Sequence, residues 1–299
     1  MTLFYTDRYV LPLPDGHRFP MRKYALLRQR VEAEGLAHRG WADPPEAMRE
    51  QLLRAHSLDY VYRATGGLLS EAEVRRLGFP WSPQMIERSL RSSGATVEAC
   101  QAALDHGVGV NLAGGTHHAF RDAAEGYCVF NDSAIAALEL VETGKARRVL
   151  IVDLDVHQGN GTASILADRP EVFTLSVHGA KNFPLRKETS DLDVALPDGT
   201  DDVAYLEELD RALGEAFERS TPDFILYVSG ADPYRDDTLG KLSLTMEGLA
   251  ERDRRVFDRA LRAGLPVAVS MAGGYARQVV DTVEIHLNTV RQAVQTLWR

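Results

Sequence analysis

The sequence predicts an α/β protein with three layers, in which helices cover both faces of a central, mostly parallel β-sheet. From residue 107 onwards, short apolar segments alternate with segments of helical pattern, as in βαβ units. Residues 149–152 are apolar without a break and mostly β-branched, which is typical of a strand buried on both faces. Because no linker, repeat or low-complexity segment separates the elements, we expect residues 1–299 to form one domain.

The first third of the chain is predicted to be helical after an initial loop. Residues 1–20 are rich in proline and aromatic side chains, so we expect an ordered loop that packs on the body. Ser70, followed by Glu71 and Glu73, indicates a helix N-terminus, and Gly78 indicates where that helix ends. The expected helices span residues 21–35, 45–55, 71–77 and 84–106, with another helix starting near Ser57.

The rest of the chain is predicted to alternate between strand and helix, as crossover connections between parallel strands require. The expected strands span residues 107–112, 148–152, 172–177, 224–228 and 267–271. The expected helices span residues 132–142, 162–167, 206–218 and 246–263, and a final helix runs to about Trp298.

The composition argues against several classes of function. The chain has 34 basic and 43 acidic residues and a net charge of −9, which argues against a nucleic-acid-binding surface. Its two cysteines, Cys100 and Cys128, form neither a disulfide framework nor a Cys-x-x-Cys zinc motif. No apolar run approaches the roughly 18 residues that a membrane span needs, and charge near Met1 argues against a signal peptide. We therefore expect a cytoplasmic protein.

Three side chains that can bind a metal follow the apolar strand at alternate positions. They are Asp153, Asp155 and His157. Alternate residues of an extended chain point to the same side, so two carboxylates and one imidazole converge before residues 159–161 turn the chain. These ligand types suit Zn²⁺ or Fe²⁺.

Polar side chains of catalytic type follow four of the predicted strands. Ligands of open parallel sheets bind beyond the carboxyl ends of the strands, so we expect these side chains to meet in one site. They are His117 and His118, the triplet Asp153, Asp155 and His157, then Asp232, and finally Tyr275.

The strand-end residues supply a complete ligand set for one metal ion. Asp155, His157 and Asp232 give three protein ligands and leave an open position for water, as in catalytic zinc sites. The remaining carboxylate, Asp153, can orient a histidine from behind. We therefore predict a catalytic metal centre rather than a structural one.

The histidine pair and the tyrosine complete the predicted site. His117 and His118 lie on a glycine-rich turn, from which one or both can reach a water at the metal. Tyr275 follows two glycines that let the backbone approach closely. Its hydroxyl can donate a hydrogen bond to an oxyanion that develops during a reaction.

Several motifs taken together resemble the zinc-dependent histone deacetylase family, which has the arginase/deacetylase fold. The resemblance covers most of the chain, and it is closest to the class IV branch in residues 181–184, 192–200 and 237–240. The core motifs are Gly114-Gly115-Thr116-His117-His118-Ala119, Gly126-Tyr127-Cys128-Val129-Phe130-Asn131-Asp132, Asp153-Leu154-Asp155-Val156-His157-Gln158-Gly159-Asn160-Gly161, Gly230-Ala231-Asp232 and Gly273-Gly274-Tyr275.

The resemblance implies roles for individual residues. His118 is expected to be the general base and to pair with Asn160, whereas His117 is expected to pair with Asp153 and to act as an electrostatic partner or proton carrier. Tyr275 is expected to polarise the amide carbonyl. The residues expected to line a tunnel for the lysine side chain are Gly126, Tyr127 and Phe183.

The resemblance also implies ions and an inner pocket. Zn²⁺ is expected at Asp155, His157 and Asp232, with Fe²⁺ as an alternative. A structural K⁺ ion is expected near Asp153, Asp155 and His157, with ligands from the backbone around Ser176. Arg18 resembles an arginine near the inner acyl pocket.

The predicted activity is metal-dependent hydrolysis that removes an acetyl or longer fatty acyl group from N-acyl-lysine in proteins or peptides. One alternative is deacetylation of an acetylpolyamine or another small N-acyl amine, because residues 78–83 contain no acidic side chain to hold a peptide backbone. A two-metal ureohydrolase lacks its second ligand set, since Gly230 and Tyr234 flank Asp232 at two positions. A non-catalytic acyl-binding module is the alternative of another class. Acyl length, physiological substrate, metal in the cell and oligomeric state stay open.

Overall fold

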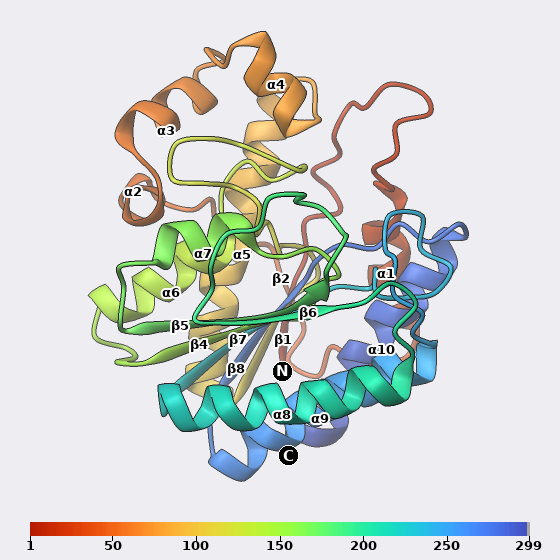
Figure 1. Cartoon of the computed structure of the whole chain (residues 1–299). Helices are drawn as coiled ribbons and strands as arrows, with labels where there is room; N and C mark the ends of the chain where they lie inside the picture. The colour runs from red at the N-terminus through yellow and green to blue at the C-terminus, as the bar shows by residue number, and fades with distance from the viewer. Residues whose placement is uncertain (298–299) are drawn as a thin grey trace.

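The computed structural model describes residues 1–297, and its eight strands form one parallel sheet between two layers of helices (Figure 1). This confirms the predicted three-layer α/β fold. The strand order is β2-β1-β3-β8-β7-β4-β5-β6, and every neighbouring pair is parallel. The strands are β1 (Thr2–Phe4), β2 (Trp41–Ala42), β3 (Val108–Asn111), β4 (Val149–Asp153), β5 (Val172–Gly179), β6 (Leu192–Leu196), β7 (Phe224–Ser229) and β8 (Val267–Met271).

Within the described residues, ten helices surround this sheet. In the first half of the chain they are α1 (Arg22–Ala33), α2 (Arg49–Ala55), α3 (Leu58–Thr65), α4 (Glu71–Leu77), α5 (Pro83–His106) and α6 (Asp132–Glu142). The later ones are α7 (Asn160–Leu166), α8 (Asp202–Ser220), α9 (Met246–Ala263) and α10 (Val279–Leu297). The predicted helix end at Trp298 lies outside the described residues. No described helix is long and apolar enough to span a bilayer.

The side chains of β4 show why its sequence is apolar without a break. Leu150 and Val152 belong to the core beneath α1, α8, α9 and α10, whereas Val149 and Ile151 belong to the core beneath α2, α5, α6 and α7. Figure 1 shows these two groups of helices on opposite faces of the sheet. A central strand that feeds both cores needs apolar residues at every position.

Three strands at the edges of the sheet were not predicted. Residues 1–20 were expected to form a loop, but they contain β1, which pairs with β3. The second unpredicted strand, β2, pairs with β1. These strands have only three and two residues, which is too short to show an alternating pattern. On the other edge, β6 pairs with β5, and its alternation of apolar residues with Asp193 and Ala195 is visible in the sequence.

Candidate metal centre and active site

The loops after β3, β4, β7 and β8 meet at one edge of the sheet, as the strand-end argument predicted. Their closeness depends on two glycines. A Cβ atom on Gly273 would lie 1.9 Å from Asp232 Oδ2, and one on Gly230 would lie 2.6 Å from the Cα of Asp155. Glycine is therefore required where the backbone passes these two carboxylates.

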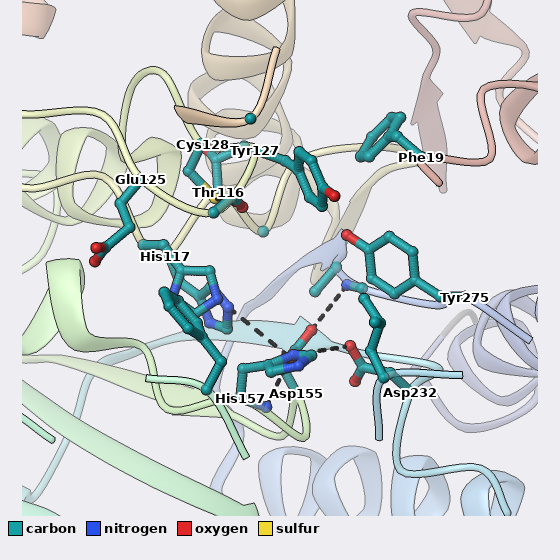
Figure 2. Close-up of a pocket in the computed structure, with 18 of the residues that line it drawn as sticks. Phe19, Thr116, His117, Glu125, Tyr127, Cys128, Asp155, His157, Asp232 and Tyr275 are labelled. Carbon is teal, nitrogen blue, oxygen red and sulfur yellow. Dashed lines mark hydrogen bonds and ion pairs between the residues drawn. The ribbon is translucent and has the colours of Figure 1, made fainter. Parts of the chain in front are cut away.

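Asp155, His157 and Asp232 form a buried cluster, with one nitrogen or oxygen ligand atom from each within 4.8 Å of the others. His157 Nδ1 lies 2.9 Å from Asp155 Oδ1 and 3.2 Å from Asp232 Oδ2. Figure 2 shows the imidazole next to Asp155, with Asp232 on the other side of a dashed line. The three residues come from the ends of two neighbouring strands, β4 and β7.

The two carboxylates of this cluster lie close together around one imidazole. Burial, followed by the charge of Asp155, raises the pKa of Asp232 to about 7. Burial disfavours the charged form of His157, but hydrogen bonds with Asp155 and Asp232 outweigh it and raise its pKa to about 10. Asp232 Oδ2 makes no hydrogen bond of good geometry with a described residue. The two carboxylates thus favour a positive charge between them.

This donor set fits a divalent cation. Two carboxylates neutralise its charge, the imidazole supplies a borderline nitrogen ligand, and three protein ligands leave a position open to solvent or substrate. Asp232 Oδ2 is buried and, within residues 1–297, makes no hydrogen bond of good geometry beyond its 3.2 Å contact with His157 Nδ1, so it keeps the acceptor capacity that a metal ligand needs. The identity of the ion does not follow from these donors alone, since Zn²⁺ and Fe²⁺ both accept them.

The two histidines after β3 are each paired with a different partner. His117 Nδ1 lies 2.6 Å from Asp153 Oδ2, and His118 Nδ1 lies 2.7 Å from Asn160 Oδ1. The two rings are 4.1 Å apart between centroids. Both pairings expected from the sequence are therefore present in the structure.

The surroundings of the two histidines separate their pKa values. Burial is the largest influence on His117, but Asp153 and Asp155 outweigh it and raise its pKa to about 9. Burial, followed by the charges of His117 and His157, lowers the pKa of His118 well below its usual value. A charged His117 thus lies beside a neutral His118, and a neutral imidazole can accept a proton.

Tyr275 reaches the same cavity from the loop after β8. Its backbone N–H donates to Asp237 Oδ2 over 2.6 Å, which fixes the loop. Figure 2 shows the hydroxyl directed into the cavity, opposite the metal-binding cluster. Burial raises the pKa of Tyr275 well above its usual value, so the hydroxyl stays protonated and can donate.

The cavity has a volume of about 590 Å³ and aromatic walls. Tyr127 lies 6.2 Å from Tyr275 between ring centroids, and Phe183 lies 4.9 Å from His118. Gly126 has φ +55°, and a Cβ atom there would lie 2.7 Å from His118 Cδ2. The predicted tunnel residues Gly126, Tyr127 and Phe183 therefore all line the cavity.

Two of the lining residues that were missed at the sequence level are Lys23 and Glu125. Lys23, not Arg18, is the buried cation near the inner end: its Nζ donates to Ala272 O over 3.1 Å, whereas Arg18 is exposed. The signal was available, because Lys23 shares one face of α1 with the buried Leu27 and Val31. The second missed residue, Glu125, also lines the cavity and contacts Asn160.

The region expected to hold K⁺ lies directly behind the metal-binding cluster. Asp153 and Ser176 are register partners in β4 and β5. Asp153 Oδ1 accepts a hydrogen bond from Asp155 N, and Ser176 Oγ lies 3.0 Å from His178 Nδ1. A potassium site here stays a prediction.

Comparison with known proteins places this geometry in a family context. Residues 17–290 match the model of the histone deacetylase domain. An uncharacterised protein of Picosynechococcus is 44% identical to this chain, and the alignment covers 94% of each of the two proteins. The histone deacetylase-like amidohydrolase of Pseudomonas aeruginosa is 31% identical over 95% of this chain and 80% of its own. The crystal structure of a histone deacetylase homologue from Aquifex aeolicus has a TM-score of 0.83 at 25% identity, covering 98% and 83% of the chains.

Proposed function

The chain belongs to the histone deacetylase family and is a deacetylase-type hydrolase, and on this premise we propose that it hydrolyses N-acyl-lysine in peptides or proteins. The observation that carries the proposal is the meeting of three kinds of group around one cavity. These are a metal-binding cluster, a neutral histidine and a tyrosine hydroxyl that is directed into the cavity. Since all eight strands belong to one sheet, we propose that residues 1–299 act as a single catalytic domain.

Asp155, His157 and Asp232 are the proposed metal ligands, with Zn²⁺ as the expected ion because zinc dependence is the norm of the family. The ion, when bound there, supplies Lewis-acid polarisation of the substrate carbonyl and lowers the pKa of water from about 15.7 towards about 7. Gly273 N donates to Asp155 Oδ2 over 2.8 Å, and Val156 N donates to Asp232 Oδ1 over 2.9 Å. These backbone donors hold the carboxylates at fixed positions before a metal binds.

His118 is the proposed general base. Its Nδ1 is engaged by Asn160, so Nε2 is the atom that takes a proton from water while the water oxygen attacks the carbonyl carbon. The same imidazole, once protonated, returns the proton to the departing amine nitrogen when the C–N bond breaks. His117, held charged by Asp153, stabilises negative charge that develops nearby.

Tyr275 is the proposed oxyanion donor, and the aromatic walls position the substrate. Its hydroxyl donates to the carbonyl oxygen as negative charge builds on that atom. The methylene stem of an acyl-lysine would pass between Tyr127 and Phe183, whose rings flank the cavity and exclude water. The acyl group would then lie towards Phe19 and Lys23 at the inner end.

The test is turnover by zinc-loaded protein on one lysine peptide that carries either an acetyl or a myristoyl group. An acetylated polyamine is assayed alongside, and a chelated sample is the control. We expect chelator-sensitive release from the peptide. Preference for the polyamine would show that the substrate is a small N-acyl amine rather than a peptide. Absence of turnover on all three substrates with zinc bound would favour a non-catalytic acyl-binding module.

A further inference from the structure

The proposed general base, His118, is oriented by the side-chain amide of Asn160. This amide can face the imidazole with either its oxygen or its nitrogen. Asn160 presents an acceptor oxygen on one side and a donor NH₂ on the other. With Oδ1 towards the ring, His118 carries its proton on Nδ1 and keeps the Nε2 lone pair. With the amide turned over, Nδ2 would donate to Nδ1, and the proton would have to sit on Nε2. Only the first arrangement leaves His118 able to act as a base.

Glu125 decides between these two arrangements. Its Oε2 lies 2.9 Å from Asn160 Nδ2, on the side of the amide away from His118. As a carboxylate it only accepts hydrogen bonds, so it requires the NH₂ end of the amide to face it. Oδ1 is then left to face His118 Nδ1 at 2.7 Å. The choice follows from the chemistry of the partner, because a carboxylate accepts from the NH₂ end of an amide and repels its oxygen.

Glu125 is itself held in place from both sides. Arg76 at the end of α4 donates through Nε to Glu125 Oε1 over 2.9 Å, and its guanidinium lies over the ring of Phe120. The backbones of Glu125 and Cys128 exchange two hydrogen bonds, of 3.2 and 2.9 Å, that close a tight turn. The amide N–H of the next residue donates to Arg76 O over 3.2 Å, which ties this turn to α4.

We propose that Glu125 is a positioning residue that selects the catalytic tautomer of His118 by fixing the amide of Asn160. Arg76, Glu125, Asn160 and His118 then form one chain of hydrogen bonds between the protein surface and the base. Arg76 and Asn160 both donate to Glu125, and His118 donates to Asn160. An aspartate at position 160 could only accept, so it would need no such partner and would be repelled by one. Glu125 and Asn160 are therefore a matched pair. The inference rests on the role of His118 proposed above.

The test exploits this matching through a double-mutant cycle. In Glu125→Ala the amide is free to turn, so we expect kcat to fall about tenfold with KM changed less than about twofold, because the hydrogen bond that fixes the amide is lost. In Asn160→Asp two carboxylates face each other, so kcat should fall as well. In the double variant the new aspartate orients His118 alone, and kcat should recover to within about threefold of wild type. Glu71→Ala, which removes an exposed partner of Arg75 on α4, is the matched control.

A purely structural role for Glu125 gives the opposite sign of coupling, because the two losses would then multiply in the double variant. That outcome overturns the proposal. A second readout does not depend on turnover: the ¹⁵N resonances of the His118 ring, assigned by their loss in His118→Gln, report which nitrogen carries the proton. We expect a protonated Nδ1 in wild type and a mixture in Glu125→Ala. An unchanged tautomer in Glu125→Ala contradicts the proposal even if the wild-type protein deacylates none of the substrates.

Discussion

The chain buries two charged clusters beside the carboxyl ends of β4 and β7, and they differ in whether their charges are satisfied. The metal-binding cluster holds two carboxylates and one imidazole, and one carboxylate oxygen makes no hydrogen bond. The second cluster, which we call the support cluster, consists of Arg252, Asp253, Tyr227 and Thr289. Arg252 and Asp253 are fully buried, and none of the four side chains has an unsatisfied polar atom within the described residues.

The support cluster explains how the other cluster can stay unsatisfied. Arg252 donates to Leu154 O over 3.2 Å and to Gly230 O over 2.6 Å, so it holds the backbone next to Asp155 and close to Asp232. Asp253 accepts hydrogen bonds from Arg252, Tyr227 and Thr289. A saturated network of this kind adds rigidity, whereas a deficit of positive charge adds affinity for a cation. Buried charge alone therefore does not indicate a functional site.

Asp232→Asn should give the largest effect and separate the clusters most clearly. Loss of a metal ligand should lower turnover at least about 10³-fold, since a bound ion contributes several kcal/mol to the transition state. The free energy of unfolding of the metal-free protein should not fall, because this variant removes a carboxylate that is costly to ionise. Chemical denaturation and turnover are measured together, with the exposed Asp198→Asn as control. A clear loss of stability in the metal-free variant would show that Asp232 stabilises the fold, as the support cluster does.

Arg252→Met should have the reverse profile. It leaves the charge of Asp253 buried without its main partner, so the free energy of unfolding should fall by about 3–5 kcal/mol. Denaturant titration of the metal-free protein measures this. Arg252→Met combined with Asp253→Leu removes both charges and should regain part of the loss. A change below about 1 kcal/mol in the single variant would show that the network contributes little.

Tyr275, which lines the cavity, and the fully buried Tyr227 allow the same comparison for hydroxyl groups. Tyr275→Phe should lower turnover by about 10²–10³, as loss of one oxyanion donor typically does, and should leave stability nearly unchanged. Tyr227→Phe removes a hydroxyl that donates to Asp253, so it should lower the unfolding free energy by about 1–3 kcal/mol with turnover largely kept. Turnover close to that of wild type in Tyr275→Phe would remove this residue from the mechanism.

His56 provides the smallest and most gradual test. It is a satisfied buried histidine, because Nδ1 contacts Phe120 O and Nε2 accepts from Asn131 N, each over 2.9 Å. Burial lowers its pKa to about 4, below the unfolded value of about 6.5. The unfolded state therefore binds the proton first, and the stability that neutral His56 contributes is present above pH 6.5 and lost as the pH falls towards 4.

The size of this pH effect is at most about 3 kcal/mol, from the shift in pKa. It is measured as the difference in unfolding free energy between wild type and His56→Gln at pH 7 and at pH 4.5. Other groups titrate in both proteins and cancel in the difference. A difference that does not depend on pH would mean that His56 is hydrated and free to charge in the folded state.

Much of the fold and of the site could be predicted from local sequence, because strand ends of a parallel sheet bring their residues together whatever the loops do. Asp153, Asp155 and His157 could be predicted as site residues from their alternate spacing alone. The paired histidines, Asp232 and Tyr275 could be predicted from their positions after apolar runs. What local sequence did not reveal was how partners from different loops meet. Glu125 acts across α4, a turn and α7, and no spacing in the sequence encodes that contact.

The measurement that tests the central claim most directly is calorimetric titration of Zn²⁺ into chelator-treated wild-type protein and into Asp232→Asn. The account predicts binding of one ion per chain in wild type and strong weakening or loss in the variant, because the variant lacks the negative charge of the proposed carboxylate ligand. It also predicts that Arg252→Lys, which keeps the charge of the support cluster, still binds one ion. Failure of wild type to bind, or equal affinity in Asp232→Asn, would contradict the claim that the unsatisfied cluster is a metal site.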